Sequence, residues 1–436
     1  MTATEIERAP ATFSVEVLGC KVNQHEAQQI RRALEAAGLR AAPPGAVPDL
    51  AVVHTCAVTA EALRQSRQAA RRCGAKTPRL ILSGCAAAAQ VDSAAEAAAA
   101  VVPAGPNWIE RLTAAAEAIG ARGAAAALGA GADLRLDRFA GHTRAFVKAQ
   151  DGCDIHCAYC IVPRLRGPPR DRPADDIVAE ARALAAAGHA ELVISGVCVG
   201  RYGLGGGEPL AGLIARLDRI EGVARLRLSS LHPAELTDDL LAAWRAARKM
   251  APHAHLPLQS GSDAVLARMG RGYTAAEFMD AVARLQRALD RPAITTDIIV
   301  GFPGETDGDF EQTLDIVRQA RFSRIHVFRF SQRPGTRAAA MRPTVSAAAA
   351  RERARLLKQE ADRLSAEFHA AWIGTTVRVL AETRNAARGE WKGYDERYIP
   401  VRFHGGPEWA GRLAPVRLTS ADAVGARGER VAEGGP

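Results

Sequence analysis

The sequence lacks a long uninterrupted hydrophobic run. Its longest nearly apolar stretch, residues 86–102, is interrupted by glutamine, aspartate and glutamate and is rich in alanine rather than leucine or isoleucine. A transmembrane helix needs about 20 consecutive and mostly apolar residues, so we expect no membrane association. The first ten residues, MTATEIERAP, are polar and carry acidic residues before any basic cluster, unlike a secretory signal peptide. We therefore expect a protein of the cytoplasm, where cysteines are thiols, ligands or catalytic groups rather than disulfides.

The composition also lacks any extreme bias. Hydrophobic residues make up 48% and charged residues 24% of the 436 residues, which excludes a collagen-like, coiled-coil or wholly disordered chain. At about 150 residues per domain, the length suggests about three domains. The net charge of +9 favours an anionic partner, with nucleic acid first. A generally arginine-rich composition explains this spread-out charge equally well.

The N-terminal part alternates between short β-branched-rich runs and helical stretches. Strands are expected at residues 13–18, 50–54 and 80–83 and near 101–102, and helices at 26–37 and 61–72. This alternation predicts an α/β domain over residues 11–135, in which helices wind around a parallel sheet.

The central part repeats this alternation on a larger scale. Six strands are expected, at residues 145–150, 192–195, 225–229, 253–257, 293–300 and 325–330, with helices at 174–187, 237–247 and 274–289 among them. They predict a partial (βα)6 barrel over residues 140–345, with its site at the carboxyl ends of the strands. A linking helix over 346–373 and a small β-barrel over 374–430 should follow, and the glycine-rich segment 425–436 suggests a disordered tail.

The strongest local signal is a C-x3-C-x2-C loop formed by Cys153, Cys157 and Cys160. Three thiolates this close can bind three irons of a 4Fe–4S cluster and leave the fourth iron open, whereas electron-transfer clusters use four cysteines. An open iron can chelate the amino and carboxylate groups of a small molecule. A zinc loop with His156 as fourth ligand is the alternative, although its spacing differs from the usual C-x2-C pairs.

A second signal is spread along the N-terminal part. Cys20, Cys56 and Cys85 each follow an expected strand, and the loops at the carboxyl ends of parallel strands gather in one crevice. This placement predicts a second three-cysteine cluster with one open iron. A free cysteine is often only a small buried residue. We expect that simpler role for Cys73 and Cys198.

The loop at 153–160 resembles that of radical S-adenosylmethionine enzymes, and the whole chain resembles the methylthiotransferases within them. The matching stretches are LGCKVNQ at 18–24, QDGC at 150–153, HLPLQSGS at 255–262 and FSQRPGT at 330–336. Residues 374–430 resemble the family's RNA-binding β-barrel, the TRAM domain. The first stretch is similar to the branch that modifies threonylcarbamoyladenosine in tRNA. His232 is more similar to the isopentenyladenosine branch.

The resemblance implies methylthiolation of carbon 2 of N6-threonylcarbamoyladenosine at tRNA position 37. It implies two 4Fe–4S clusters: one at Cys153, Cys157 and Cys160 that reduces S-adenosylmethionine, and one at Cys20, Cys56 and Cys85 that presents sulfur. An electron donor and a sulfur donor would be further partners. Because acid–base groups cannot activate an aromatic C–H, we expect no side chain in that role. The S-adenosylmethionine contacts are expected at Tyr159, Ser195, Gly196, Ser229, Ile299 and Gly301.

Binding of the tRNA anticodon stem-loop should combine phosphate contacts with capture of an unstacked base. The candidate arginines directly follow the radical loop: Arg164, Arg166, Arg170 and Arg172. A second basic surface is expected on the C-terminal barrel, at Arg378, Arg384, Arg388, Lys392 and Arg402. The alternatives are the same reaction on isopentenyladenosine in tRNA or on a ribosomal-protein aspartate. A different class of function is a non-catalytic iron–sulfur or RNA-binding protein.

Overall fold

The computed structural model describes residues 11–77, 79–89, 98–119 and 134–432. The chain divides into two compact units. Unit 1 comprises Met1–Leu136 and Ile161–Pro168, and unit 2 comprises Asp137–Cys160 and Pro169–Pro436. The chain therefore passes from unit 2 into unit 1 directly after Cys160 and returns eight residues later.

The described part of unit 1 is built on a parallel sheet with the strand order β2-β1-β3-β4-β5. The strands are β1 Thr12–Val17, β2 Arg40–Ala41, β3 Leu50–Thr55, β4 Leu80–Gly84 and β5 Ala100–Pro103. The helices are α1 Lys21–Ala36, α2 Ala60–Gly74, α3 Cys85–Ala88, α5 Trp108–Ala118 and α7 Val162–Arg166. The expected strands and helices of this part are confirmed, and the structure adds the short strand β2, which was not expected. Residues 90–97 and 120–133 of the alanine-rich segment lie outside the described residues.

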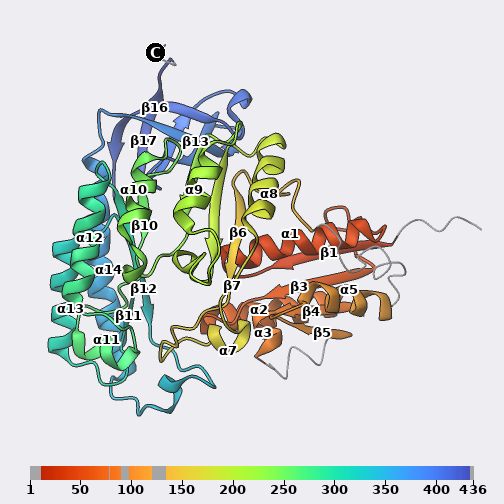
Figure 1. The fold of residues 1–436 in the computed structure, drawn as a ribbon, viewed down its shortest axis with the longest axis horizontal. Helices are drawn as coiled ribbons and strands as arrows, with labels where there is room; N and C mark the ends of the chain where they lie inside the picture. The colour runs from red at the N-terminus through yellow and green to blue at the C-terminus, as the bar shows by residue number, and fades with distance from the viewer. Residues whose placement is uncertain (1–10, 78, 90–97, 120–133, 433–436) are drawn as a thin grey trace, which may run out of the picture. The chain divides into compact units, whose positions relative to one another are not determined.

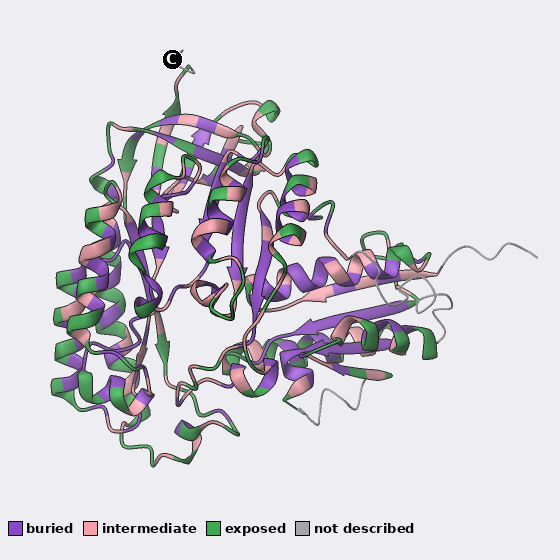
Figure 2. Cartoon of the chain, in the orientation of Figure 1, coloured by how far each residue is buried: buried purple, intermediate pink, exposed green. Residues whose placement is uncertain are grey.

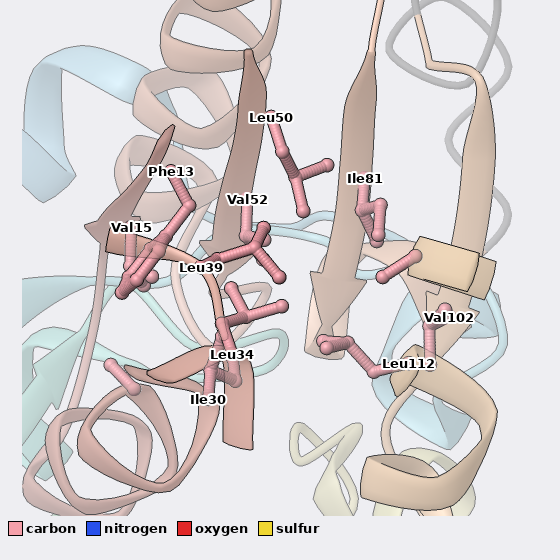
Figure 3. Close-up of a cluster of buried hydrophobic side chains, with 12 residues drawn as sticks. Phe13, Val15, Ile30, Leu34, Leu39, Leu50, Val52, Ile81, Val102 and Leu112 are labelled. Atoms are coloured by element: carbon pink, nitrogen blue, oxygen red, sulfur yellow. The ribbon is translucent and has the colours of Figure 1, made fainter. Parts of the chain in front are cut away.

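Both faces of this sheet are covered, which explains why every residue of β3 is buried. On one face, Val52 packs with Ile30 of α1 and Leu112 of α5 (Figure 3). On the other face, Val53 belongs to a cluster with side chains of α2, α3 and α7. Because side chains alternate along a strand, the adjacent residues Val52 and Val53 pack in the hydrophobic cores on opposite faces of the sheet.

Unit 2 contains the six expected parallel strands, of which Figure 1 labels β6, β10, β11 and β12. They are β6 Ala145–Asp151, β8 Glu191–Gly196, β9 Arg225–Leu228, β10 His253–His255, β11 Ala293–Val300 and β12 Arg324–Arg329. β6, β8 and β9 form one sheet, together with the antiparallel β7 Arg170–Asp171. β10, β11 and β12 form another, and the isolated parallel bridge between Ser230 and His255 connects the two.

Helices alternate with these strands. They are α8 Ala174–Ala186, α9 Leu210–Asp218, α10 Asp238–Ala246, α11 Asp263–Met269, α12 Ala275–Ala288, α13 Asp307–Ala320 and α14 Ala347–Ala370. Figure 2 shows that the strands are largely buried, whereas the helices expose one face. The expected α/β partial barrel is therefore confirmed. Within the described residues, no helix combines the length and the hydropathy needed to cross a bilayer.

The C-terminal part forms a closed barrel with the strand order β13-β14-β15-β17-β16. The strands are β13 Thr376–Asn385, β14 Glu390–Tyr394, β15 Pro400–His404, β16 Leu413–Ala421 and β17 Ala426–Arg430. The expectation of a disordered tail over 425–436 was wrong for β17. This strand pairs with both β15 and β16 and closes the barrel, so its order comes from neighbouring strands rather than from its own composition.

Candidate functional site

In unit 1, three cysteines lie at one edge of the sheet. β1, β3 and β4 are adjacent and parallel. Cys56 and Cys85 directly follow β3 and β4, and Cys20 follows β1 after Leu18 and Gly19. Cys20 is the N-cap of α1, and Cys85 is the first residue of α3. The fold thus brings three thiols that are far apart in the sequence to the same edge of the sheet, as expected for loops at the carboxyl ends of parallel strands.

The three thiols are close enough to affect one another electrostatically. Burial raises the pKa of the Cys85 thiol to about 12, and the charges of Cys20 and Cys56 act in the same direction. A Cβ atom on Gly19 would lie 2.7 Å from the Cys56 Sγ, and Gly19 has φ +103°, so glycine is required there. The loop before Cys20 therefore packs directly on Cys56. Three thiols, one exposed and two buried, fit a 4Fe–4S cluster whose fourth iron has no protein ligand.

In unit 2, the radical loop follows β6 and is held by Gln150. Its Nε2 donates to the backbone oxygens of Asp151 and Gly152, both at 2.8 Å. Its Oε1 accepts from the backbone N–H of Cys198 at 2.9 Å. The expected position of the loop after the first barrel strand is therefore supported by a side chain for which we had predicted no role.

Two donors approach the sulfurs of the radical loop. Arg271 Nη1 donates to Cys157 Sγ at 3.2 Å, and the backbone N–H of Ile155 donates to Cys153 Sγ at 3.4 Å. Hydrogen bonds to cysteine sulfur are among the features that set the potential of iron–sulfur clusters. Three half-buried thiols with such donors therefore fit a 4Fe–4S cluster. Among the described residues, no group of three His, Cys, Asp or Glu side chains is arranged around a single metal ion, and this holds for both groups of three cysteines. His156 is exposed.

Cys198 had been expected to be incidental, but it lies beside this loop. Its thiol hydrogen-bonds with Cys153, which lowers the pKa of Cys153 to about 7 and raises the pKa of Cys198. The Cys198 Sγ is also 2.9 Å from Glu235 Oε1. Both cysteines come from loops at the carboxyl ends of neighbouring strands, β6 and β8. Cys153 and Cys198 are far apart in the sequence, so their contact could be recognised only once β6 and β8 were known to be neighbours in the sheet.

Of the expected S-adenosylmethionine residues, Tyr159 lies in the radical loop after β6, and the other five lie at the carboxyl ends of β8, β9 and β11. Tyr159 and Ile299 pack on the same apolar cluster, which contains Phe302. Gly196 N donates to Ser229 Oγ at 3.3 Å. The remaining two have internal partners: the buried Ser195 hydroxyl donates to Val147 O at 3.3 Å, and Gly301 N donates to Glu305 Oε2 at 2.6 Å.

The four arginines that follow the radical loop have different environments. Arg166 is only 3% exposed and forms an ion pair with Glu26 in unit 1 at 2.9 Å. Arg172 pairs with the buried Glu180 in unit 2 at 3.0 Å. Both guanidiniums are thus occupied inside the protein, because each neutralises a buried carboxylate. Arg164 is exposed. Arg170 is half-buried, and its Nη2 lies 3.7 Å from Asp151 Oδ2. Surface phosphate contacts remain a prediction for Arg164 and Arg170.

On the C-terminal barrel, the cations predicted to form a second basic surface are exposed at Arg378, Arg388, Lys392 and Arg402, and Arg384 is half-buried. Trp391, on the same barrel, is buried. It belongs to the hydrophobic core of the barrel, and its Nε1 donates to Gly406 O at 2.9 Å. Trp391 therefore packs inside the barrel, and its indole N–H already has a partner.

Comparisons with known proteins agree with this architecture. Residues 147–317 match the Radical SAM superfamily, and residues 12–103 match the family described as "Uncharacterized protein family UPF0004". A solved structure of a radical S-adenosylmethionine methyltransferase, TsrM from Kitasatospora setae, matches with a TM-score of 0.56. It covers 76% of this chain and 77% of that chain at 15% identity, which shows a shared fold.

Curated relatives match over almost the full length. "Threonylcarbamoyladenosine tRNA methylthiotransferase MtaB" of Thermotoga maritima is 35% identical over 95% of this chain and 96% of its own length. "tRNA-2-methylthio-N(6)-dimethylallyladenosine synthase" of Sphingopyxis alaskensis is 34% identical over 95% of this chain and 96% of its own length. The chain therefore belongs to the radical S-adenosylmethionine methylthiotransferases that modify tRNA.

Proposed function

We propose that this enzyme methylthiolates carbon 2 of N6-threonylcarbamoyladenosine at tRNA position 37, with S-adenosylmethionine and two 4Fe–4S clusters. The observation that carries the proposal is the presence of two three-cysteine groups in one chain, each following strands of a parallel sheet. One group suffices for radical chemistry, so the second needs a separate role. Presenting the sulfur atom that is transferred is the role that the reaction requires.

The residues of the radical loop would hold the first cluster at Cys153, Cys157 and Cys160. When bound, this cluster and S-adenosylmethionine supply the radical chemistry that an unreactive aromatic C–H needs. The protein's own part is to orient the groups and to exclude water. Tyr159 and Ile299 would offer an apolar surface to the adenine, and Ser195, Gly196, Ser229 and Gly301 are the further residues expected to contact S-adenosylmethionine.

Cys20, Cys56 and Cys85 would hold the second cluster. Cys56 and Cys85 are buried and Cys20 is exposed, so one side of this group faces outward. An outward-facing position suits a group that receives sulfur from a donor and passes it on. The sulfur donor and the electron donor remain further partners of unknown identity, and the cytoplasm is the proposed location.

The charge around the radical loop supports an anionic substrate. Arg201 is already paired with Asp154 at 3.1 Å, and the buried Arg271 donates to Cys157. Arg337 is exposed and donates to the backbone oxygen of His156 at 2.9 Å. The threonylcarbamoyl group carries a carboxylate, which a guanidinium group binds well. An isopentenyl group is apolar and would gain nothing from the charge of Arg337.

One observation favours the isopentenyl substrate as second candidate. His232, the residue similar to that branch, has its pKa lowered to about 4 by burial and by the charge of Arg271. It is therefore neutral at physiological pH and packs edge-on against Tyr273, with the ring centroids 5.1 Å apart. A neutral imidazole beside a tyrosine ring offers a surface for an apolar group.

Mass spectrometry of tRNA nucleosides from a strain with and without the gene tests the proposal. We expect 2-methylthio-N6-threonylcarbamoyladenosine to disappear on deletion and to return on complementation. Loss of 2-methylthio-isopentenyladenosine instead would establish the second candidate. Unchanged nucleosides together with a methylthiolated ribosomal-protein aspartate would overturn both. A reduced, cluster-loaded protein that released no deoxyadenosine would support a non-catalytic role.

A further inference from the structure

Asn23 lies in the first turn of α1, three residues after Cys20, and is completely buried. Its Nδ2 donates two hydrogen bonds, to Leu18 O at 2.8 Å and to Thr55 O at 2.9 Å. Leu18 stands just before the loop of Cys20, and Thr55 stands directly before Cys56. One amide group thus ties together the two backbone segments that carry two of the three thiols.

Thr55 extends this connection to the third thiol. Its Oγ1 donates to Ser83 O at 2.6 Å and accepts from the backbone N–H of Ala86 at 3.1 Å, in the short helix that begins at Cys85. The approach is close, because a Cβ atom on Gly84 would lie 2.6 Å from Thr55 O. The position of Thr55 therefore fixes the turn of Cys85 as well as that of Cys56.

The orientation of the Asn23 amide is set by Arg166. Nη2 of Arg166 donates to Asn23 Oδ1 at 2.9 Å and also to Glu26 Oε2 at 2.9 Å. Glu26 in turn lies 3.0 Å from His54 Nε2, and His54 Nδ1 lies 2.7 Å from Ser83 Oγ. A reversed amide would place its oxygen against two carbonyl oxygens and its NH₂ against a guanidinium. The buried Arg166 therefore permits only the orientation that ties the two loops.

We propose that Asn23, oriented by Arg166, is a positioning residue that holds the loops of Cys20 and Cys56 against the turn of Cys85 so that the three thiols can receive the second cluster. The inference rests on the proposed function, which assigns a cluster to these cysteines. Asn23 Oδ1 also accepts from the Cys20 Sγ at 3.8 Å, so the amide contacts one of the three thiols directly. Its two N–H donors act through the backbone oxygens of Leu18 and Thr55. Removing these two donors should let the three thiols move relative to one another.

The test uses the full-length chain with Cys153, Cys157 and Cys160 replaced by alanine, so that only the N-terminal group can bind a cluster. In this background the variants N23D and N23A are reconstituted anaerobically with iron and sulfide. N23D keeps the size of the side chain and can still pair with Arg166, but it cannot donate to the two carbonyl oxygens. R166K retains a positive charge without the planar fork that reaches both Asn23 and Glu26.

The matched control is L34A. Leu34 belongs to the same helix, α1, and its truncation removes buried apolar volume from the core of unit 1 rather than a contact to the cysteine loops. The measurements are iron and acid-labile sulfide per chain, the rate of iron release to a chelator, the electron paramagnetic resonance spectrum of the reduced cluster, and thermal unfolding. We expect N23D and N23A to release iron about ten-fold faster than the parent, with an altered spectrum. R166K should show the same changes to a smaller degree. L34A should lower the unfolding temperature and keep the parent's spectrum.

Iron content, release rate and spectrum that were unchanged in a folded N23D chain would overturn the inference. So would L34A if it released iron as fast as N23D at a similar unfolding temperature, because the effect would then be one of general stability. If N23A does not fold, the iron release and the spectra of N23D and R166K still test the inference. A parent chain that binds no iron would instead overturn the second cluster itself, and the inference with it.

Discussion

The guanidinium of Arg227 lies over the ring of Tyr398, with its Cζ 3.7 Å from the ring centroid. Arg227 belongs to β9 of the partial barrel, and Tyr398 precedes β15 of the C-terminal barrel. Arg227 also donates to the backbone oxygen of Glu396 at 2.8 Å, and its Nε donates to Glu191 Oε1 at 2.8 Å. The C-terminal barrel is thus bound to the amino-terminal ends of β8 and β9, opposite the strand ends that carry the radical loop. Buried charge holds the two parts of unit 2 together.

Replacing Glu191 should therefore destabilise the protein strongly. Although burial opposes ionisation, Arg227, Arg225 and Arg144 together hold the pKa of Glu191 below its usual value. E191Q would leave the buried Arg225 and Arg227 without a carboxylate, which costs about 3–5 kcal/mol. The free energy of unfolding, from urea denaturation, measures this loss. E352Q removes an exposed carboxylate from a surface pair and should cost about 0–1 kcal/mol. Equal losses in the two variants would contradict a dominant role for the buried network.

The two cysteine groups should separate two measurable activities. C56A should still release deoxyadenosine from S-adenosylmethionine under reducing conditions but should form no methylthio nucleoside, because the radical loop is intact and the sulfur-presenting group is incomplete. C157A should abolish both. C73A is the matched control, since Cys73 is half-buried in α2 and belongs to neither group, and both activities should persist. A methylthio product from C56A would assign the sulfur-presenting role elsewhere.

Exposed and buried arginines after the radical loop should differ in their effect on tRNA binding. R164A should weaken binding and lower the salt slope of log Kd by about 0.7–0.9, the contribution of one phosphate contact. Fluorescence anisotropy with an anticodon stem-loop at several salt concentrations measures both quantities. R219A removes an exposed arginine that follows α9 and should change neither. An unchanged salt slope in R164A would remove Arg164 from the RNA surface.

His369 should make unit 2 sensitive to acid. Burial lowers the pKa of His369 below its ordinary value of 6.5, and its Nδ1 lies 2.7 Å from Asp422 O. Below about pH 6.5 the unfolded chain binds a proton that the folded chain does not, so stability falls as the pH drops from there. H369N keeps a donor for Asp422 O without this titration. We expect the difference in unfolding temperature between H369N and the parent to grow in favour of H369N from pH 7.5 to pH 5. A constant difference would show that His369 does not titrate in this range.

The order of strands and helices was readable from the sequence, because apolar runs of strand length alternate with helical stretches. The runs ending before Cys20, Cys56 and Cys85 gave both the sheet and the positions of the thiols. β17 was missed, since Ala426–Arg430 has no apolar alternation and becomes a strand only through its pairing with β15 and β16.

The sequence alone determined which residue types are available and where each follows a strand. The tertiary structure decided which of them face one another. Arg166 looks like a surface arginine in an Arg/Pro-rich loop, yet the chain turns back into unit 1 after Cys160 and buries it against Glu26 and Asn23. Cys198 lies beside Cys153 because β6 and β8 are neighbours in the sheet. Such contacts join residues that are distant in sequence, and local patterns report only on neighbours along the chain.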